Sequence, residues 1–185
     1  MKNLGYQIPG KLPDAIRARM VNLLNQQLAE AIDLQLQSRQ AQWNVCGPQF
    51  LSLHLFYDQI AKVVGEAAAE IAGRIGQLGG RSLVTRRVVM ETSRLPEYPL
   101  RLSTSEQHLA ALACALASFG ASVRAAAGAT CGDRDLDSTY VLTRVWQTTD
   151  KLLWMVRSYL QKRRTGLGAE ECSQTRAYEE EGEAA

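Results

Sequence analysis

The chain has 185 residues, of which 46% are hydrophobic and 22% charged. This length and balance suit a globular protein with one full core and argue against a disordered or fibrous chain. The 21 basic and 19 acidic residues give a net charge of +2, which is too balanced to indicate nucleic-acid binding by itself. No secretory signal and no apolar run of membrane-spanning length is expected, and none of the four cysteines forms a CxxC pair. We therefore expect a cytoplasmic protein with free thiols.

The first half of the chain predicts two long helices separated by a turn. Apolar residues recur at helical spacing from about residue 14 to 42, and Pro13 suits the first turn of this helix. A second helix is predicted over 49–78, and Gly79-Gly80 is expected to cap its C-terminus.

The second half predicts a long connection and two more helices. The connection covers 81–102, and helices follow over about 104–127 and 137–163, with Ser103 or Ser105 as the N-cap of the first. Two antiparallel helix pairs joined by one long crossover make an all-α four-helix bundle.

The two ends of the chain differ from this helical domain of residues 14–163. Residues 1–13 form an N-terminal extension with only Lys2 and Lys11 as cations. Residues 164–185 lose the apolar periodicity and are rich in Gly, Glu and Ala, which predicts a disordered tail. From residue 161 onward there are four basic and six acidic residues, a local net charge of −2.

The run from residue 42 to 80 carries the clearest chemical signal. It places His54 and Asp58 four residues apart on a predicted helix, so the two side chains share a face. An imidazole and a carboxylate stacked in this way can hold one transition-metal ion. The same spacing is also compatible with an ordinary hydrogen bond.

This run resembles the Dps mini-ferritins, a branch of the ferritin-like superfamily. Their hallmark is His-Trp-Asn-Val-x-Gly-x-x-Phe-x-x-x-His-x-x-x-Asp, followed by an acidic pair and Leu-Gly-Gly. The matching residues here are Trp43, Asn44, Val45, Gly47, Phe50, His54, Asp58, Leu78, Gly79 and Gly80. The likeness continues in LLNQQLAEAIDLQLQ, LPEYPL and TTDKLLWMVRSYL, and so covers nearly the whole chain to about residue 163. It implies a ferritin-like bundle that assembles into a hollow shell of twelve subunits.

The resemblance also implies a site and shows where this chain departs from it. In the family, a di-iron ferroxidase centre lies across a two-fold subunit interface. His54 and Asp58 match two of its ligands, but Gln42 stands at the position of the first histidine, and Ala69 and Gly73 stand at the acidic pair. Three of five ligand positions are therefore lost, and ferroxidase activity is left open.

Glu66 and Glu70 are candidate replacement ligands on the same helix. Each lies three residues before a lost acidic position and is turned from it by about 60°. The alternative is that both are solvated glutamates. With His54 and Asp58 they leave open a weak site for iron or zinc, completed by water. The other histidine, His108, is expected at the surface or in a helix cap.

Other residues have two interpretations each. Trp43 matches the family tryptophan beside the metal centre, where it intercepts oxidising equivalents, but simple burial at a helix end also accounts for it. Trp154 is expected to pack in the core. Asp133, Asp135 and Asp137 match the region where acidic residues line the family's three-fold pores, and they are equally interpretable as acids that complement a helix dipole.

Together these features predict a Dps-like mini-ferritin for iron binding and storage and for protection from oxidative stress. Its ferroxidase centre is expected to be degenerate or rebuilt. The alternative is a non-catalytic cage or DNA-associated structural protein, alone or co-assembled with a competent paralogue. DNA binding is expected to be weak or absent, because the N-terminal segment is poor in lysine and the tail is acidic.

Overall fold

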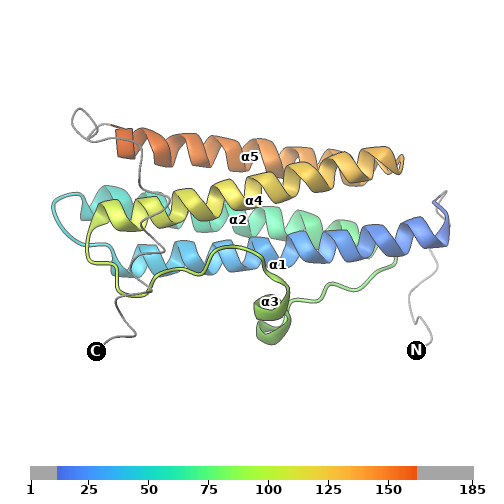
Figure 1. Cartoon of the computed structure of the whole chain (residues 1–185), viewed down its shortest axis with the longest axis horizontal. Coiled ribbons are helices and arrows are strands. Elements are labelled where there is room, and N and C mark those ends of the chain that lie inside the picture. Colours follow the sequence, from blue (N-terminus) through green and yellow to red (C-terminus); the bar gives the residue numbers. More distant parts are fainter. Residues whose placement is uncertain (1–11, 162–185) are drawn as a thin grey trace, which may run out of the picture.

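A computed structural model describes residues 12–161, which contain five α-helices and no strand (Figure 1). The helices α1 (Asp14–Asn44), α2 (Phe50–Gln77), α4 (Ser105–Gly132) and α5 (Leu136–Gln161) form an antiparallel bundle. The short helix α3 (Arg86–Thr92) lies in the crossover between α2 and α4. The predicted all-α bundle, with its crossover between the second and third long helices, is confirmed.

The structure does not test the predictions for the two chain ends, and it shows a helix in the crossover that was not predicted. The acidic tail over 164–185, and nearly all of the extension over 1–13, lie outside the described residues. The helix α3 was not predicted, because a helix of about two turns with one buried residue, Val89, leaves no apolar period in the sequence.

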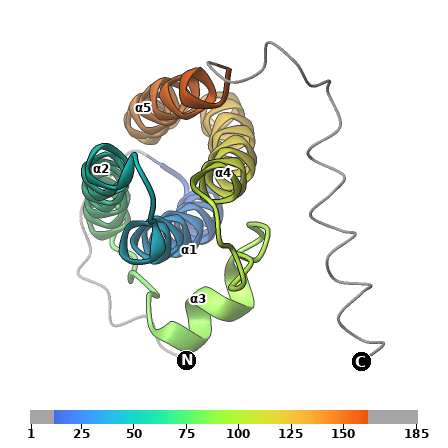
Figure 2. The same cartoon turned by 90° about the vertical axis from the view of Figure 1, so that its left-hand side faces the viewer.

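The core lies along the common axis of the four long helices, which Figure 2 shows end-on. Each helix turns one apolar face inward, and burial of each large aliphatic side chain contributes about 1.5–3 kcal/mol. The largest fully buried side chains are Tyr57, Phe119, Met20, Leu24, Leu28, Leu34, Leu53, Ile60, Ile71, Ile75, Leu112 and Leu116.

The C-terminus of α2 confirms the expected glycine cap. Gly79 has a φ of 71°, in the left-handed region that glycine adopts without a steric penalty. Its N–H donates to the Gly76 carbonyl at 2.9 Å, and the N–H of Gly80 donates to the Ile75 carbonyl at 2.9 Å. These two bonds make a Schellman motif, which satisfies carbonyls that the helix end leaves free.

The N-terminus of α4 corrects the expected cap. The N-cap is Thr104 rather than Ser103 or Ser105. The Thr104 hydroxyl accepts from the Gln107 N–H at 3.3 Å, and the Gln107 side chain accepts from the Thr104 N–H at 3.0 Å. This reciprocal capping box needs a glutamine or glutamate three residues after the cap, and Thr104 is the residue so placed.

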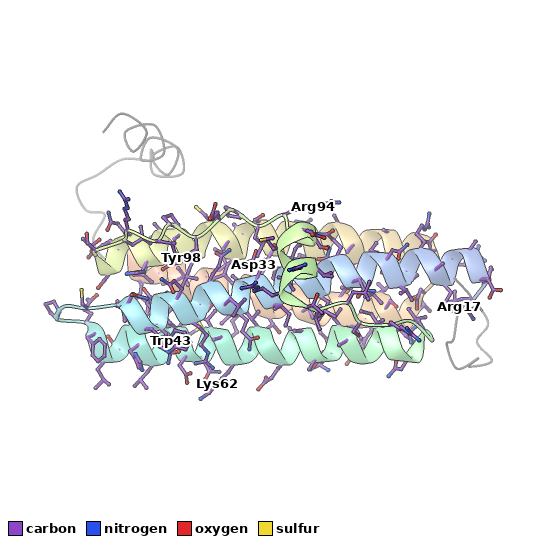
Figure 3. The ribbon with its side chains drawn as sticks, turned by 90° about the horizontal axis from the view of Figure 1, so that it is seen from below. Arg17, Asp33, Trp43, Lys62, Arg94 and Tyr98 are labelled. Atoms are coloured by element: carbon purple, nitrogen blue, oxygen red, sulfur yellow. The ribbon has the colours of Figure 1, made fainter. Side chains whose placement is uncertain are left out.

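Polar side chains of α1 fasten the crossover to the bundle. Those that bond to it are Asn25, Gln26, Asp33 and Gln37. Gln26 donates to the Thr92 carbonyl at 2.7 Å, and the Ser93 hydroxyl donates to Asp33 at 2.5 Å. Figure 3 shows Asp33 on α1 beside α3. The bonds from Asn25, Gln26 and Gln37 satisfy backbone carbonyls of a segment that has little regular structure of its own.

Helix α4 corrects the expectation about apolar runs. It is the one described helix long and apolar enough to cross a membrane by length and composition, with a mean hydropathy of 1.6 over an 18-residue window. Its residues Leu112, Leu116 and Phe119 are fully buried against the other helices. This is the pattern of a core helix in a bundle.

His108 and Trp154 are placed opposite to expectation. His108 is buried beside Tyr98, whose hydroxyl lies 2.5 Å from Nδ1 of the imidazole. Burial lowers the pKa of His108 and raises that of Tyr98, so both side chains are neutral at pH 7. Trp154 is 66% exposed on α5 and does not pack in the core. A histidine can replace an apolar residue in a core when one ring nitrogen has a partner.

Candidate functional site

Asp58 lies between two cations of its own chain. The Arg39 guanidinium of α1 donates to one carboxylate oxygen at 2.5 Å, and the Lys62 ammonium, one turn along α2, lies 2.8 Å from the other. The hydrogen bonds from Lys62 and Arg39 lower the pKa of Asp58 to about 2. Asp58 is therefore ionised at neutral pH, with both of its oxygens occupied.

His54 is held by the end of α1. Its Nδ1 lies 3.0 Å from the Gln42 carbonyl oxygen, so the tautomer with its proton on Nδ1 donates there. Its Nε2 then carries the lone pair, and the Gln42 side-chain nitrogen faces it at 3.4 Å. Arg39 fixes this amide by donating to its oxygen at 2.7 Å. The protein's own donors thus face both potential ligand atoms.

The residues present do not fit a di-iron centre. Two iron ions need several carboxylates and imidazoles, and here each Asp58 oxygen and the Nε2 of His54 already faces an N–H group of the protein. Ala69 and Gly73 are exposed on α2 and supply no ligand atom. Within residues 12–161, no group of three or more His, Cys, Asp or Glu side chains is arranged to hold a metal ion.

The two candidate replacement glutamates have different surroundings. The Glu70 carboxylate lies 3.3 Å from the Arg144 guanidinium of α5. Glu66 is exposed, one turn beyond Lys62 on α2. The subunit itself does not bring either glutamate into the Asp58 cluster.

Large apolar side chains surround this cluster on the outer surface. Trp43 is 71% exposed at the end of α1, so the interpretation of simple burial is wrong within this subunit. Leu36 of α1 is 59% exposed, and Leu51 and Leu55 of α2 are 67% and 58% exposed. Exposed leucine and tryptophan side chains gathered on one face are typical of an interaction surface.

The three candidate pore aspartates have separate surroundings. Asp135 is buried, bonds to Arg74 at 2.7 Å and accepts from the Ser138 N–H at 3.2 Å as α5 begins. Asp133 pairs with Arg19 of α1. Asp137 is 82% exposed and lies 3.3 Å from Arg74. Of the three carboxylates, that of Asp137 is the most open to solvent.

Arg39 and Lys62 were missed by the sequence analysis. Lys62 had a local signal, because an aspartate and a lysine four residues apart on a helix form an ion pair. Arg39 had none, since its contact with Asp58 depends on how α1 packs against α2. Trp146, which had no interpretation from sequence, lies under the Arg124 guanidinium at 5.0 Å in a cation–π contact.

Comparisons with known proteins agree with this architecture. The family model described as the ferritin-like domain matches residues 21–165. A DNA protection during starvation protein of Agrobacterium fabrum is 30% identical over 158 residues, covering 85% of this chain and 98% of that protein.

Solved structures lead to the same group. DpsC from Streptomyces coelicolor superposes with a TM-score of 0.82 at 25% identity, covering 91% of this chain and 98% of that one. The tetragonal form of Mycobacterium smegmatis Dps superposes with a TM-score of 0.78 at 30% identity, covering 84% and 93%. In both, the likeness covers more than four fifths of this chain.

Proposed function

Because the chain belongs to the Dps family of ferritin-like proteins, we propose that it is a divergent mini-ferritin with a degenerate ferroxidase centre. It binds and stores iron and protects against oxidative stress, but does not oxidise ferrous iron rapidly at the family's site. The observation that supports the second part is the position of Arg39 and Lys62 on the two oxygens of Asp58.

The charges explain why iron is disfavoured there. A divalent cation that bound Asp58 would have to displace Arg39 or Lys62, and would then lie within a few ångströms of both. His54 alone offers one neutral nitrogen, and Gln42, Ala69 and Gly73 add no anionic ligand. At most one weakly held iron or zinc ion per subunit is compatible with this donor set.

We further propose that the protein assembles into a homo-oligomer, with twelve subunits as the expected number. The exposed apolar side chains around Asp58 on α1 and α2 need a cover, and an isologous contact with a second copy supplies it. Iron would enter the shell past Asp137, the most exposed of the three candidate pore aspartates. Size-exclusion chromatography with light scattering tests the assembly, and a stable monomer at micromolar concentration would contradict it.

Stopped-flow absorbance after mixing ferrous iron with peroxide tests the proposed chemistry. Wild-type protein is expected to oxidise iron close to the uncatalysed rate, and His54→Ala should leave this rate unchanged. Fast oxidation that is lost in His54→Ala would show that the centre is active. If Glu66→Ala or Glu70→Ala also abolished that activity, a rebuilt centre would replace the degenerate one.

The occupied Asp58 oxygens also favour a second candidate, a non-catalytic cage subunit that co-assembles with a competent paralogue. Such a subunit would supply shell and interface but no oxidation. Purification from native cells separates the two, since a mixed shell would contain a second ferritin-like chain in a fixed ratio. A shell of this chain alone would rule out the co-assembly candidate.

A further inference from the structure

Side-chain size and charge change along the outward face of α2. With 100° per residue, Leu51, Leu55, Lys62, Glu66, Ala69, Gly73 and Gly76 fall within a stripe about 80° wide. All seven are exposed. Large side chains lie at the start of the stripe, opposite charges in its middle and small residues at its end.

The middle of the stripe is self-complementary in charge. Lys62 and Glu66 are one helical turn apart, so a second α2 laid antiparallel across a two-fold axis near residue 64 sets each lysine against the partner's glutamate. Figure 3 shows Lys62 at the outer edge of α2, away from the crossover.

The charges of the Asp58 cluster do not balance within one subunit. Arg39 and Lys62 bring two positive charges to the single negative charge of Asp58, which leaves one in excess. Covering this cluster with an apolar surface would bury that excess charge at a high cost. Glu66 forms no ion pair with any other described residue, and a partner's Glu66 would neutralise the excess.

The same antiparallel register pairs large side chains with small ones. It sets Leu55 against Gly73 of the partner subunit and Leu51 close to Gly76 of the partner subunit. A Cβ added at Gly73 or Gly76 would meet no atom within 4 Å, so the fold of the subunit itself does not need glycine there. Since glycine weakens a helix interior, its presence at both positions is explained by close approach from outside.

We propose that two copies of this chain dock α2 against α2 in this register, with Lys62 of each facing Glu66 of the partner subunit. This proposal rests on the proposed function in one respect, because both take this face of α2 as a subunit interface. An ionic pair and leucine-to-glycine packing then hold the two subunits together without metal. In this interface, the losses at positions 69 and 73 make room for the partner's side chains as well as removing ligands.

Charge reversal measured by sedimentation velocity over a dilution series tests the register. Glu66→Lys places lysines opposite each other and is expected to raise the concentration at which the assembly dissociates by about tenfold or more. Adding Lys62→Glu restores opposite charges and should return that concentration towards the wild-type value. Lys151→Glu, a charge reversal on α5 outside the stripe, is the matched control and should assemble as wild type.

A second variant tests the packing. Gly73→Leu should weaken assembly while circular dichroism shows unchanged helix content, and Ala121→Leu on the exposed face of α4 should do neither. Wild-type assembly of Glu66→Lys and Gly73→Leu, or no recovery in the double charge variant, would overturn the register. These outcomes do not depend on iron. If the wild type oxidises iron slowly but the double charge variant does not recover assembly, the register is wrong and the proposed function still holds.

Discussion

Two arginine–aspartate pairs, near the two ends of α2, tie this helix to its neighbours in different ways. Arg74 pairs with Asp135 of α5, and their side chains are 9% and 2% exposed. Arg39 of α1 pairs with Asp58, and their side chains are 29% and 23% exposed. The chemistry of the contact is the same, but the surroundings differ.

The buried pair makes several further hydrogen bonds within the chain. Arg74 also donates to Ser138 at 2.9 Å, and Asp135 accepts from the same residue as α5 begins. The half-exposed pair shares its aspartate with Lys62, keeps one positive charge in excess and has exposed leucines around it. The first arrangement is a structural joint between helices, whereas the second is suited to contact with another molecule.

The largest expected effect follows from breaking the buried pair. Arg74→Ala leaves Asp135 buried without its cation and should lower the free energy of unfolding by about 3–5 kcal/mol. Denaturant titration at one fixed protein concentration measures this loss. Arg144→Ala is the matched control, because its pair with Glu70 is exposed and contributes only about 0–1 kcal/mol. Equal losses in the two variants would remove the distinction between a joint and a surface pair.

Comparing the two pairs also shows which features can be predicted from the sequence. Apolar periodicity and the glycines at 79–80 predicted the four long helices and the end of α2, because these signals are local. The cap at Thr104 was misassigned among three adjacent hydroxyl residues, since only the position three residues before Gln107 completes a capping box. The buried pairing of Asp135 could not be predicted, because its partner, Arg74, is 61 residues away in the chain.

The resemblance identified the metal-ligand positions, but the contacts of the remaining ligand residues could not be predicted from it. The losses at Gln42, Ala69 and Gly73 are visible in the sequence. The contact of Arg39 with Asp58 is not, because it requires the packing of α1 on α2. The exposure of Trp43 and Trp154 could not be predicted either, because a single apolar residue on an outer helix face looks the same in the sequence as one on the inner face.

A smaller effect is expected from the pH dependence of the half-exposed pair. The folded-state pKa of Asp58, about 2, lies below its ordinary value of 3.8, so the ion pairs stabilise the fold at pH above about 4. That contribution is lost as the pH falls from about 4 towards 2. The difference in unfolding midpoint between wild type and Asp58→Asn should be constant from pH 7 to about pH 4, and should then shrink on further acidification. A difference that disappears already between pH 7 and 5 would contradict the low pKa.

The smallest expected effect is on DNA. The N-terminal segment offers only Lys2 and Lys11 as cations, fewer than the several phosphate contacts that tight binding needs. Gel shifts with duplex DNA should show weak binding at about 50 mM salt and none at about 200 mM salt. Tight binding at the higher salt concentration would show that another surface of the protein acts as a DNA site.

The central claim is that Arg39 and Lys62 hold the place of a metal ion at Asp58. Anaerobic calorimetric titration of ferrous iron into wild type and Arg39→Gln/Lys62→Gln measures it directly. Wild type should bind at most one ion per subunit weakly, and the double variant should bind at least about tenfold more tightly through His54 and Asp58. Tight binding of two ions per subunit by wild type, abolished by His54→Ala, would contradict the claim.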